Sequence, residues 1–431
     1  MSVYIHQLET VVPEMSYGQE FASELMQRNV GDDERTRRII KSIYSRSGIR
    51  KRHSVIHDFS DGPGDPLFFD KNGDRLSPPD TRFRNDYYTR EARPLFSRLA
   101  KQLIAHAPDF EINEITHVIT VSCTGFFAPG PDFHVVRDLD LPGSTQRYHI
   151  GFMGCYAAFQ GLKMAQAFCR SAPDAVVLVL CVELCTLHLQ FHDNPDAIIA
   201  ASVFADGGSG ALVSARKPSG RNFESQLNSE SQTSTEPEAI SGFQNISESD
   251  INPGSQVKTD SRSNSNFQAP IEILSFYSDL TPNGEKDMAW TIGNEGFLMK
   301  LSTYVPEIIR SNIGPVLDNI LKSADLTRTE IEHWAIHPGG RAILDNICDA
   351  LQIPEEKISA SRSILSDYGN MSSATILFVL KELAESMRRP DGQKGQKSET
   401  PQTVFGMAFG PGLTIESGLF NFYGTYSHSR G

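Results

Sequence analysis

The sequence predicts an α/β fold built from two similar halves. Short apolar stretches typical of buried strands alternate with longer stretches of helical periodicity, first between residues 116 and 216 and again after residue 271. A polar, serine-rich segment separates the two runs. The chain of 431 residues is long enough for one large domain or two to three ordinary ones, so we expect a sizeable hydrophobic core.

The first run contains three strands and one helix. Residues 175–182 read AVVLVLCV, an uninterrupted apolar stretch that is too short to span a membrane and is typical of a strand buried on both faces. The predicted elements of this half are strands at 117–122, 175–182 and 211–214 and a helix at 155–169.

The second run repeats the same rhythm. Apolar stretches of strand length again alternate with longer stretches of helical periodicity, which is why the two halves are expected to resemble each other. The predicted elements are strands at 271–277, 333–336, 404–409 and 413–419 and helices at 297–322 and 370–387.

A low-complexity segment divides the chain into three parts. Residues 217–270 include 12 serines among 54 residues and few clustered apolar side chains, so they cannot bury enough surface to offset the entropy of ordering. We therefore expect a disordered surface insertion at 217–270 between an N-terminal half, 1–216, and a C-terminal half, 271–431. A shorter polar stretch at 389–402 predicts a hairpin or helix-to-strand loop.

The charge balance is acidic, with 40 Lys and Arg against 53 Asp and Glu, a net charge of −13. This argues against binding nucleic acid or anionic lipid through the overall field of the protein. One dense basic run, residues 35–53, carries Ile39, Ile40 and Ile43 at helical spacing. It predicts either a solvated helix face or a docking face for a phosphorylated cofactor.

Several features bear on where the protein resides. No apolar run reaches the 18 or so residues of a membrane span, and the first residues lack the charged segment and apolar core of a signal peptide. We expect a cytoplasmic protein. Its cysteines lack the C-x₂-C spacing of metal sites, so we expect no metal centre and mostly buried thiols. The six are Cys123, Cys155, Cys169, Cys181, Cys185 and Cys348.

Three segments carry the candidate chemistry. Cys155, in GFMGCYAAF, follows a glycine-flanked turn and opens a helix, where the helix dipole and unpaired N–H groups favour a thiolate. His337 ends an apolar strand before Pro-Gly-Gly, at the edge where α/β sites gather. Asn370 precedes a long apolar helix. Taken singly, they are also consistent with a buried structural cysteine, a turn histidine and a helix-capping asparagine.

Other catalytic patterns are absent from the sequence. It contains no G-x-S-x-G elbow, no G-x-x-x-x-G-K-[ST] phosphate loop and no H-E-x-x-H helix, and DGGSGA at 206–211 fails the dinucleotide-binding pattern. Hydrolase, P-loop and zinc-protease functions are therefore not indicated.

Together the segments resemble the type III polyketide synthases, the chalcone synthase-like enzymes of the thiolase superfamily. The resemblance covers nearly the whole chain apart from 217–270 and 389–402. It implies the five-layered αβαβα thiolase fold, a homodimer, acyl-CoA and malonyl-CoA as substrates, and no metal or redox cofactor. The strongest matches are GCYAAFQGLKMA, HPGGRAILD, YGNMSSAT and FGPGLTIE, and weaker ones are SCTGFFAPGPDF and VFADGGSGALV.

The resemblance also implies a decarboxylative Claisen mechanism. Cys155 would hold the acyl starter as a thioester, with its thiolate stabilised by His337. His337 and the amide of Asn370 would stabilise the enolate that forms when malonyl-CoA loses CO₂. The chain would then grow by two carbons in each round before it cyclises.

Further residues match positions around the cavity and the CoA site of the family. Phe204 and Phe297 match two aromatic gatekeepers, although both also fit as plain core aromatics. Arg46 matches a basic position that contacts CoA phosphates, with Lys41 and Arg38 nearby. Members of the family vary the cavity lining at positions that match Cys123, Cys185, Ala200 and Met288. Cys123 is also a candidate second functional thiol. The loop that shapes the cyclisation cavity in the family matches Gly410, Pro411 and Gly412.

The sequence departs from the plant pattern at two places, Ala408 and Tyr156-Ala157-Ala158, which points to a bacterial-type member. Two alternatives remain open at this stage. One is a single-round ketoacyl synthase that uses the same three residues. The other is an inactive thiolase-fold scaffold whose serine-rich insertion binds a partner.

Overall fold

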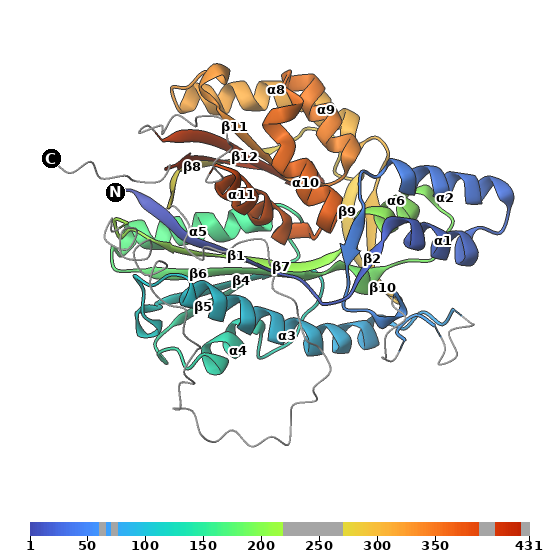
Figure 1. The fold of residues 1–431 in the computed structure, drawn as a ribbon, viewed down its shortest axis with the longest axis horizontal. Helices are drawn as coiled ribbons and strands as arrows, with labels where there is room; N and C mark the ends of the chain where they lie inside the picture. Colours follow the sequence, from blue (N-terminus) through green and yellow to red (C-terminus); the bar gives the residue numbers. More distant parts are fainter. Residues whose placement is uncertain (60–65, 70–75, 219–269, 388–400, 424–431) are drawn as a thin grey trace, which may run out of the picture.

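The computed structural model describes residues 1–59, 66–69, 76–218, 270–387 and 401–423 (Figure 1). Nearly all of the insertion predicted at 217–270 and of the loop predicted at 389–402 lies outside these described residues. Both remain predictions.

Helices and strands alternate in five layers (Figure 1). The outer helices on one side are α3 (Thr81–Ala105) and α4 (Pro131–Asp138), and those on the other are α8 (Val305–Ser323) and α9 (Arg341–Leu351). Two helices form the middle layer, α5 (Ala157–Ser171) and α11 (Thr375–Ser386). The predicted αβαβα arrangement of the thiolase fold is therefore confirmed.

Nine strands hydrogen-bond in one continuous series, β11-β12-β13-β8-β1-β7-β6-β4-β5. The strands of the second half, β11-β12-β13-β8, and those of the first half, β1-β7-β6-β4-β5, form the two β layers, which are called the two sheets below (Figure 1). Strand β1 joins the two halves, because its residues Val3–Ile5 pair with Ile271–Ile273 of β8. The strands of the first half are β1 (Val3–Val11), β4 (His117–Ser122), β5 (Gln146–Gly151), β6 (Val176–Leu184) and β7 (Asp206–Ser214). Those of the second half are β8 (Ile271–Leu280), β11 (His333–Ile336), β12 (Gln402–Gly410) and β13 (Thr414–Phe422).

Strand β6 shows why a continuous apolar run forms a strand here. Val177 and Val179 belong to the core between the two sheets, whereas Leu178 and Leu180 belong to the core beneath α3. Alternate side chains of a strand point to opposite faces, and helices cover both faces of this sheet. The run therefore has no solvent-facing side on which polar residues would be favoured.

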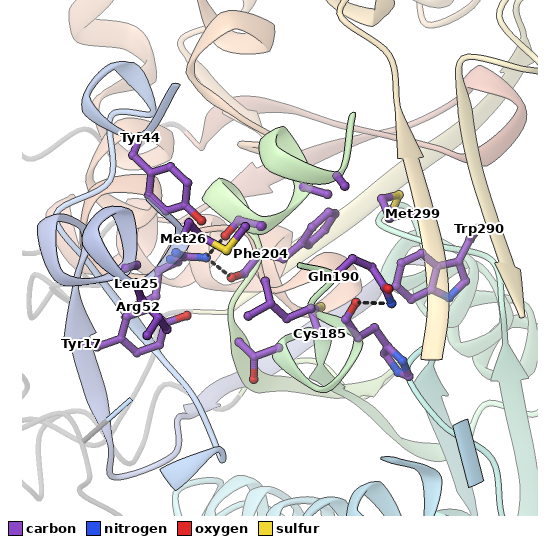
Figure 2. A pocket seen from close by; sticks show the side chains of 17 residues that line it. Tyr17, Leu25, Met26, Tyr44, Arg52, Cys185, Gln190, Phe204, Trp290 and Met299 are labelled. Carbon is purple, nitrogen blue, oxygen red and sulfur yellow. Dashed lines mark hydrogen bonds between the residues drawn. The ribbon is translucent and has the colours of Figure 1, made fainter. Parts of the chain in front are cut away.

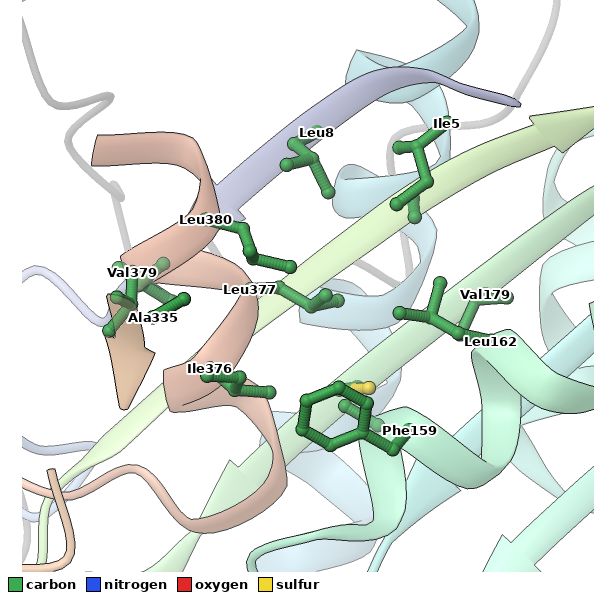
Figure 3. Close-up of a cluster of buried hydrophobic side chains, with 14 of the residues drawn as sticks. Ile5, Leu8, Phe159, Leu162, Val179, Ala335, Ile376, Leu377, Val379 and Leu380 are labelled. Carbon is green, nitrogen blue, oxygen red and sulfur yellow. The ribbon is translucent and has the colours of Figure 1, made fainter. Parts of the chain in front are cut away.

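The parts of the middle layer that face the two sheets are apolar for the same reason. Helix α11 lies between the two sheets, and its residues Leu377, Val379 and Leu380 are fully buried against strands of both halves (Figure 3). Phe159 of α5 packs in the same core. A helix enclosed by protein on every side needs no polar face.

The remaining elements gather mostly at one end of the sheets, on the right in Figure 1. They surround the candidate site described below. These elements are β2 (Ser16–Gly18), α1 (Gln19–Val30), α2 (Glu34–Arg46), β3 (Lys51–His53), α6 (Pro195–Val203), β9 (Met288–Gly293), β10 (Gly296–Leu301) and α10 (Ser359–Tyr368).

The helix predicted at 297–322 is wrong over its first residues. Gly296–Leu301 is strand β10, which pairs with β9 across a two-residue turn between Gly293 and Gly296. Gly296 has φ +99°, a conformation that favours glycine at the end of such a turn. The helix begins only at Val305, with Pro306 in its first turn.

The other predicted boundaries differ less. The strands expected at 117–122, 271–277, 333–336, 404–409 and 413–419 are present. The helix expected from 370 begins at Thr375 after a short 3₁₀ turn, Ser372–Ala374.

Among the described residues, none of the helices combines the length and the apolarity that crossing a bilayer requires.

Candidate active site

The three residues singled out in the sequence come from separate elements and meet at one cavity, the central cavity. Cys155 precedes α5, His337 follows β11, and Asn370 follows α10. Five further predicted residues line the same cavity: Cys123, Cys185, Phe204, Met288 and Pro411. Concave sites that are lined mainly by apolar side chains, with a few convergent polar groups, are typical of small-molecule binding.

A tight turn places Cys155 in the cavity. Gly154 has φ +86°, and a Cβ atom there would collide with the ring of Pro411. Glycine is therefore required for the turn to pack against the 410–412 loop. The turn leaves the Cys155 side chain at the start of α5, where it is buried but borders the cavity.

Backbone pairing fixes Asn370 beside Phe204. The N–H of Asn370 donates to the carbonyl of Val203 at 2.8 Å, and its carbonyl accepts from the N–H of Ala205 at 2.9 Å. The side-chain Oδ1 accepts from the N–H of Ser372 at 2.9 Å and lies 4.0 Å from Sγ of Cys155. Because both ends of the residue are held, the amide has one orientation relative to the thiol.

His337 is held by its backbone alone. Its N–H donates to the carbonyl of Met407 at 2.8 Å, which continues the β11–β12 pairing by one residue. Both ring nitrogens are buried and have no hydrogen-bond partner among the residues that the structure describes. Burial lowers the pKa of His337 to about 3, so the ring is neutral. A neutral imidazole with two unengaged nitrogens offers one donor and one acceptor to a ligand in the cavity.

The expectation that the helix dipole favours a thiolate at Cys155 is wrong for the unliganded chain. Burial raises the pKa of Cys155 to about 11, and the Ser372 hydroxyl and the Asn370 amide offset only part of this shift. Burial destabilises the thiolate by more than the partial positive charge at the helix N-terminus stabilises it. Burial therefore favours a neutral thiol and a neutral imidazole in the resting site.

A buried carboxyl group lies behind the cavity and was missed in the sequence. Glu183 is fully buried and accepts from the N–H of Cys123 at 3.0 Å and from the hydroxyl of Thr124 at 2.9 Å. Sγ of Cys123 lies 3.3 Å from both Glu183 Oε1 and Ser372 Oγ. The sequence contains one indication of this buried carboxyl group, a glutamate near the end of an otherwise apolar strand. Burial beside Glu183 raises the pKa of Cys123 well above its usual value.

Phe204 and Phe297 have different environments. Phe204 borders both the central cavity and a second cavity. Phe297 borders neither; it is buried and stacks on His188 with ring centroids 4.1 Å apart. Met299, two residues along β10, lines both cavities in its place. Because a helix was predicted at 297–322, the segment was not analysed with the two-residue periodicity of a strand, which would have pointed to Met299.

The loop at 410–412 supports the cavity in two ways. Pro411 lines it directly. Gly410 lies against the Tyr156 ring, with which a Cβ atom would collide, and Gly412 has φ +74°. These glycines let the loop approach the start of α5 and do not line the cavity themselves.

Comparisons with known proteins agree with this geometry. Residues 4–217 match the family model for the N-terminal domain of chalcone and stilbene synthases, and residues 272–422 match that for the C-terminal domain. The chain belongs to the chalcone and stilbene synthase family. It is a type III polyketide synthase, and such enzymes are acyl-transferring condensing enzymes.

Three relatives illustrate the similarity. An alpha-pyrone synthesis polyketide synthase-like protein of Mycobacterium tuberculosis, Pks18, is 28% identical over 382 residues, which cover 89% of this chain and 82% of the relative. The crystal structure of PKS-I from the brown alga Ectocarpus siliculosus has a TM-score of 0.78 at 26% identity, covering 98% of this chain and 99% of that one. For 1,3,6,8-tetrahydroxynaphthalene synthase of Streptomyces coelicolor, the TM-score is 0.74 at 22% identity, covering 98% and 100%, and this shows the shared fold.

The basic residues expected to contact CoA lie on the outer side of this polyketide synthase. Lys41 and Arg46 are exposed on α2 and line neither cavity. Arg38 is paired with Glu34 of the same helix at 2.7 Å. Arg341 was missed in the sequence, although it directly follows the HPGG motif. It packs close to Gly48, just beyond the end of α2. A role in binding CoA stays a prediction for Arg38, Lys41 and Arg46.

We predict that alkylation of Cys155 in the unliganded enzyme is slow at neutral pH and rises about tenfold per pH unit toward a pKa of about 11, because only the thiolate reacts. Iodoacetamide labelling across a pH series, with the Cys155 peptide quantified by mass spectrometry, measures this profile. The Cys155→Ser variant identifies the peptide that loses label. Fast labelling that is independent of pH near neutrality would show a preformed thiolate–imidazolium pair instead.

Proposed function

We propose that this polyketide synthase loads an acyl-CoA starter onto Cys155, extends it by decarboxylative condensation with malonyl-CoA, and releases a cyclised product of the pyrone, resorcinol or phloroglucinol type. The observation that carries the proposal is the meeting of a thiol, an unengaged imidazole and an oriented amide at one mostly apolar cavity. The reaction uses CoA thioesters as substrates and needs no resident metal or redox cofactor.

Loading begins from the neutral pair. Cys155 transfers its proton to a ring nitrogen of His337 as Sγ attacks the thioester carbonyl of the acyl-CoA. The bond from the carbonyl carbon to the CoA sulfur breaks, and the leaving CoA thiolate takes the proton from His337. The acyl group remains on Cys155 as a thioester. Because both groups start and end this step neutral, no charge stays buried in the cavity.

Extension uses His337 and Asn370 as donors. Malonyl-CoA loses CO₂, and the electron pair of the broken C–C bond moves into the thioester to form an enolate. The N–H of His337 and the Nδ2 group of Asn370, which otherwise holds only a long 3.3 Å bond to Gly339, donate to the enolate oxygen. The enolate carbon then attacks the acyl group on Cys155, whose sulfur leaves as a thiolate.

That thiolate is the nucleophile for the next round. It attacks the extended CoA thioester directly, so only the first loading step requires deprotonation of a thiol with a raised pKa. Repeated extension is thereby favoured over renewed loading. The number of rounds and the ring that forms depend on the shape of the cavity, to which Met288 and Pro411 contribute.

We also propose a homodimer, the assembly that the family resemblance implies. Strand β5 is the outermost strand at one end of the sheet, and its outer edge has no strand partner among the described residues. A second copy related by a two-fold axis could pair along this edge. In sedimentation velocity we expect a species of twice the 47.7 kDa chain mass, whereas a monomer at all concentrations would contradict the proposal.

The central test is mass spectrometry of the protein with a panel of acyl-CoA starters and malonyl-CoA. We expect an acyl adduct on the Cys155 peptide and a cyclised product. The Cys155→Ala variant should form neither, although decarboxylation of malonyl-CoA can persist because His337 and Asn370 remain. A linear β-ketoacyl product would identify a single-round synthase. No adduct with any starter would favour an inactive scaffold.

Asn370→Ala should slow malonyl-CoA decarboxylation by about 10²–10³-fold, the loss typical of removing one oxyanion donor, and affect starter loading less. Release of CO₂ and acylation of Cys155 are measured separately. Asn312→Ala is the matched control, because Asn312 lies on α8 and bonds only to the carbonyl of Ile308. Equal losses in both steps would mean that Asn370 is structural.

His337→Ala should impair both starter loading and malonyl-CoA decarboxylation. Full activity of the His337→Ala variant would refute the assignment of His337.

A further inference from the structure

Arg52 is a buried arginine that reaches the backbone beside the candidate active site. It lies on β3, is only 3% exposed, and points toward Phe204 near the rings of Tyr17 and Tyr44 (Figure 2). The centroids of these rings lie 5.1 and 5.9 Å from the guanidinium carbon. Arg52 does not line the central cavity, so a direct role in the reaction is not indicated.

The guanidinium joins the end of α6 to the residue that follows the helix. Nη1 donates to the carbonyl of Ala201 and to that of Phe204, both at 2.7 Å. Ala201 lies in the last turn of α6, and Phe204 comes directly after Val203, where the helix ends. Because one nitrogen holds both carbonyls, the backbone around Phe204 cannot shift without breaking at least one of these bonds.

The stem of the same side chain packs on Gly369. This glycine has φ +73°, and a Cβ atom there would lie 2.9 Å from Cγ of Arg52 and 3.0 Å from the carbonyl oxygen of Val203. Glycine is therefore favoured by its conformation and by the close approach of Arg52. Gly369 directly precedes Asn370. Arg52 thus contacts both of the segments that pair with each other at Phe204 and Asn370.

That pairing is an isolated bridge and not part of a longer series of strand bonds. Two backbone hydrogen bonds form it, from the N–H of Asn370 to Val203 and from the N–H of Ala205 to Asn370, at 2.8 and 2.9 Å. So short a pairing is marginal without support from its surroundings. The contacts that Arg52 makes with both segments supply this support.

Packing alone does not account for an arginine at this place. Removing a guanidinium from water destabilises the fold unless other bonds replace those to water, and a methionine would fill a similar space without that penalty. A methionine has no N–H to donate to the two carbonyls. What distinguishes arginine here is therefore its restraint on the backbone that holds Asn370.

We infer that Arg52 is a positioning residue for the condensation, because it holds the amide of Asn370 in the orientation that decarboxylation of malonyl-CoA requires. The inference rests on the proposed function, in which this amide donates to the enolate oxygen. Arg52 acts through the backbone of Phe204 and through Gly369. Displacement of a reacting geometry by about 1 Å can lower a rate by 10²-fold. Starter loading uses Cys155 and His337 and depends less on this amide.

Arg52→Met is expected to lower kcat for malonyl-CoA decarboxylation by about 10–100-fold, with little change in KM or in the rate of Cys155 acylation. The decisive measurement combines this substitution with Asn370→Ala. Because Arg52 acts through the amide, the double variant should decarboxylate malonyl-CoA about as fast as Asn370→Ala alone. A residue that only stabilises the fold would add its own loss to that of Asn370→Ala.

Arg84→Met is the matched control. Arg84 is also fully buried, and its Nη1 likewise donates to two backbone carbonyls, those of Leu187 and Leu189, at 2.9 and 3.0 Å. It lines neither the central cavity nor the second one. Both substitutions should lower the melting temperature, but only Arg52→Met should change the ratio of decarboxylation to acylation.

Two results would overturn the inference: additive losses in the double variant, or equal falls in decarboxylation and acylation in Arg52→Met. Arg52→Lys, which keeps the charge but lacks the planar guanidinium, replaces Arg52→Met if that variant does not fold. An unchanged ratio in Arg52→Lys would then overturn the inference. Failure of the proposed function is distinct, because the unaltered enzyme would then neither decarboxylate malonyl-CoA nor become acylated at Cys155.

Discussion

Burial of Cys155 and His337 at the central cavity is the constraint on which the chemistry of this protein depends. Desolvation lowers the pKa of His337 and raises that of Cys155, so the two groups most able to carry charge are both neutral at rest. A thiolate–imidazolium pair in this cavity would form only if their attraction exceeded the desolvation penalty of the two charges. A buried environment of low polarity also strengthens each hydrogen bond that is made within it.

The five-layered fold produces this environment. The first half supplies Cys155 at the start of α5, and the second half supplies His337 and Asn370 at the ends of β11 and α10. The middle helices pack against strands from both halves, which brings the two sets of residues to one place. Neither half alone contains the complete site. The pairing of β1 with β8 ties the halves together along the sheet.

The sequence predicted the layers and the three candidate residues that meet at the central cavity, because both follow from short-range patterns. Apolar runs of strand length and glycine turns before Cys155 and after His337 are local features. What it could not predict depends on contacts distant in sequence. The β9–β10 hairpin was predicted as the start of a helix, and Phe297 was selected by family resemblance, whereas Met299 lines the cavity. The pKa of Cys155 is governed by burial, which the local helix dipole does not reveal.

Phe204 links the two cavities to the catalytic amide through its backbone. Its carbonyl accepts from Arg52, and the residues on either side of it, Val203 and Ala205, pair with Asn370. The wall between the cavities and the donor that faces the thiol are thus parts of one hydrogen-bonded unit. A side chain that displaced Phe204 would also move Asn370 relative to Cys155.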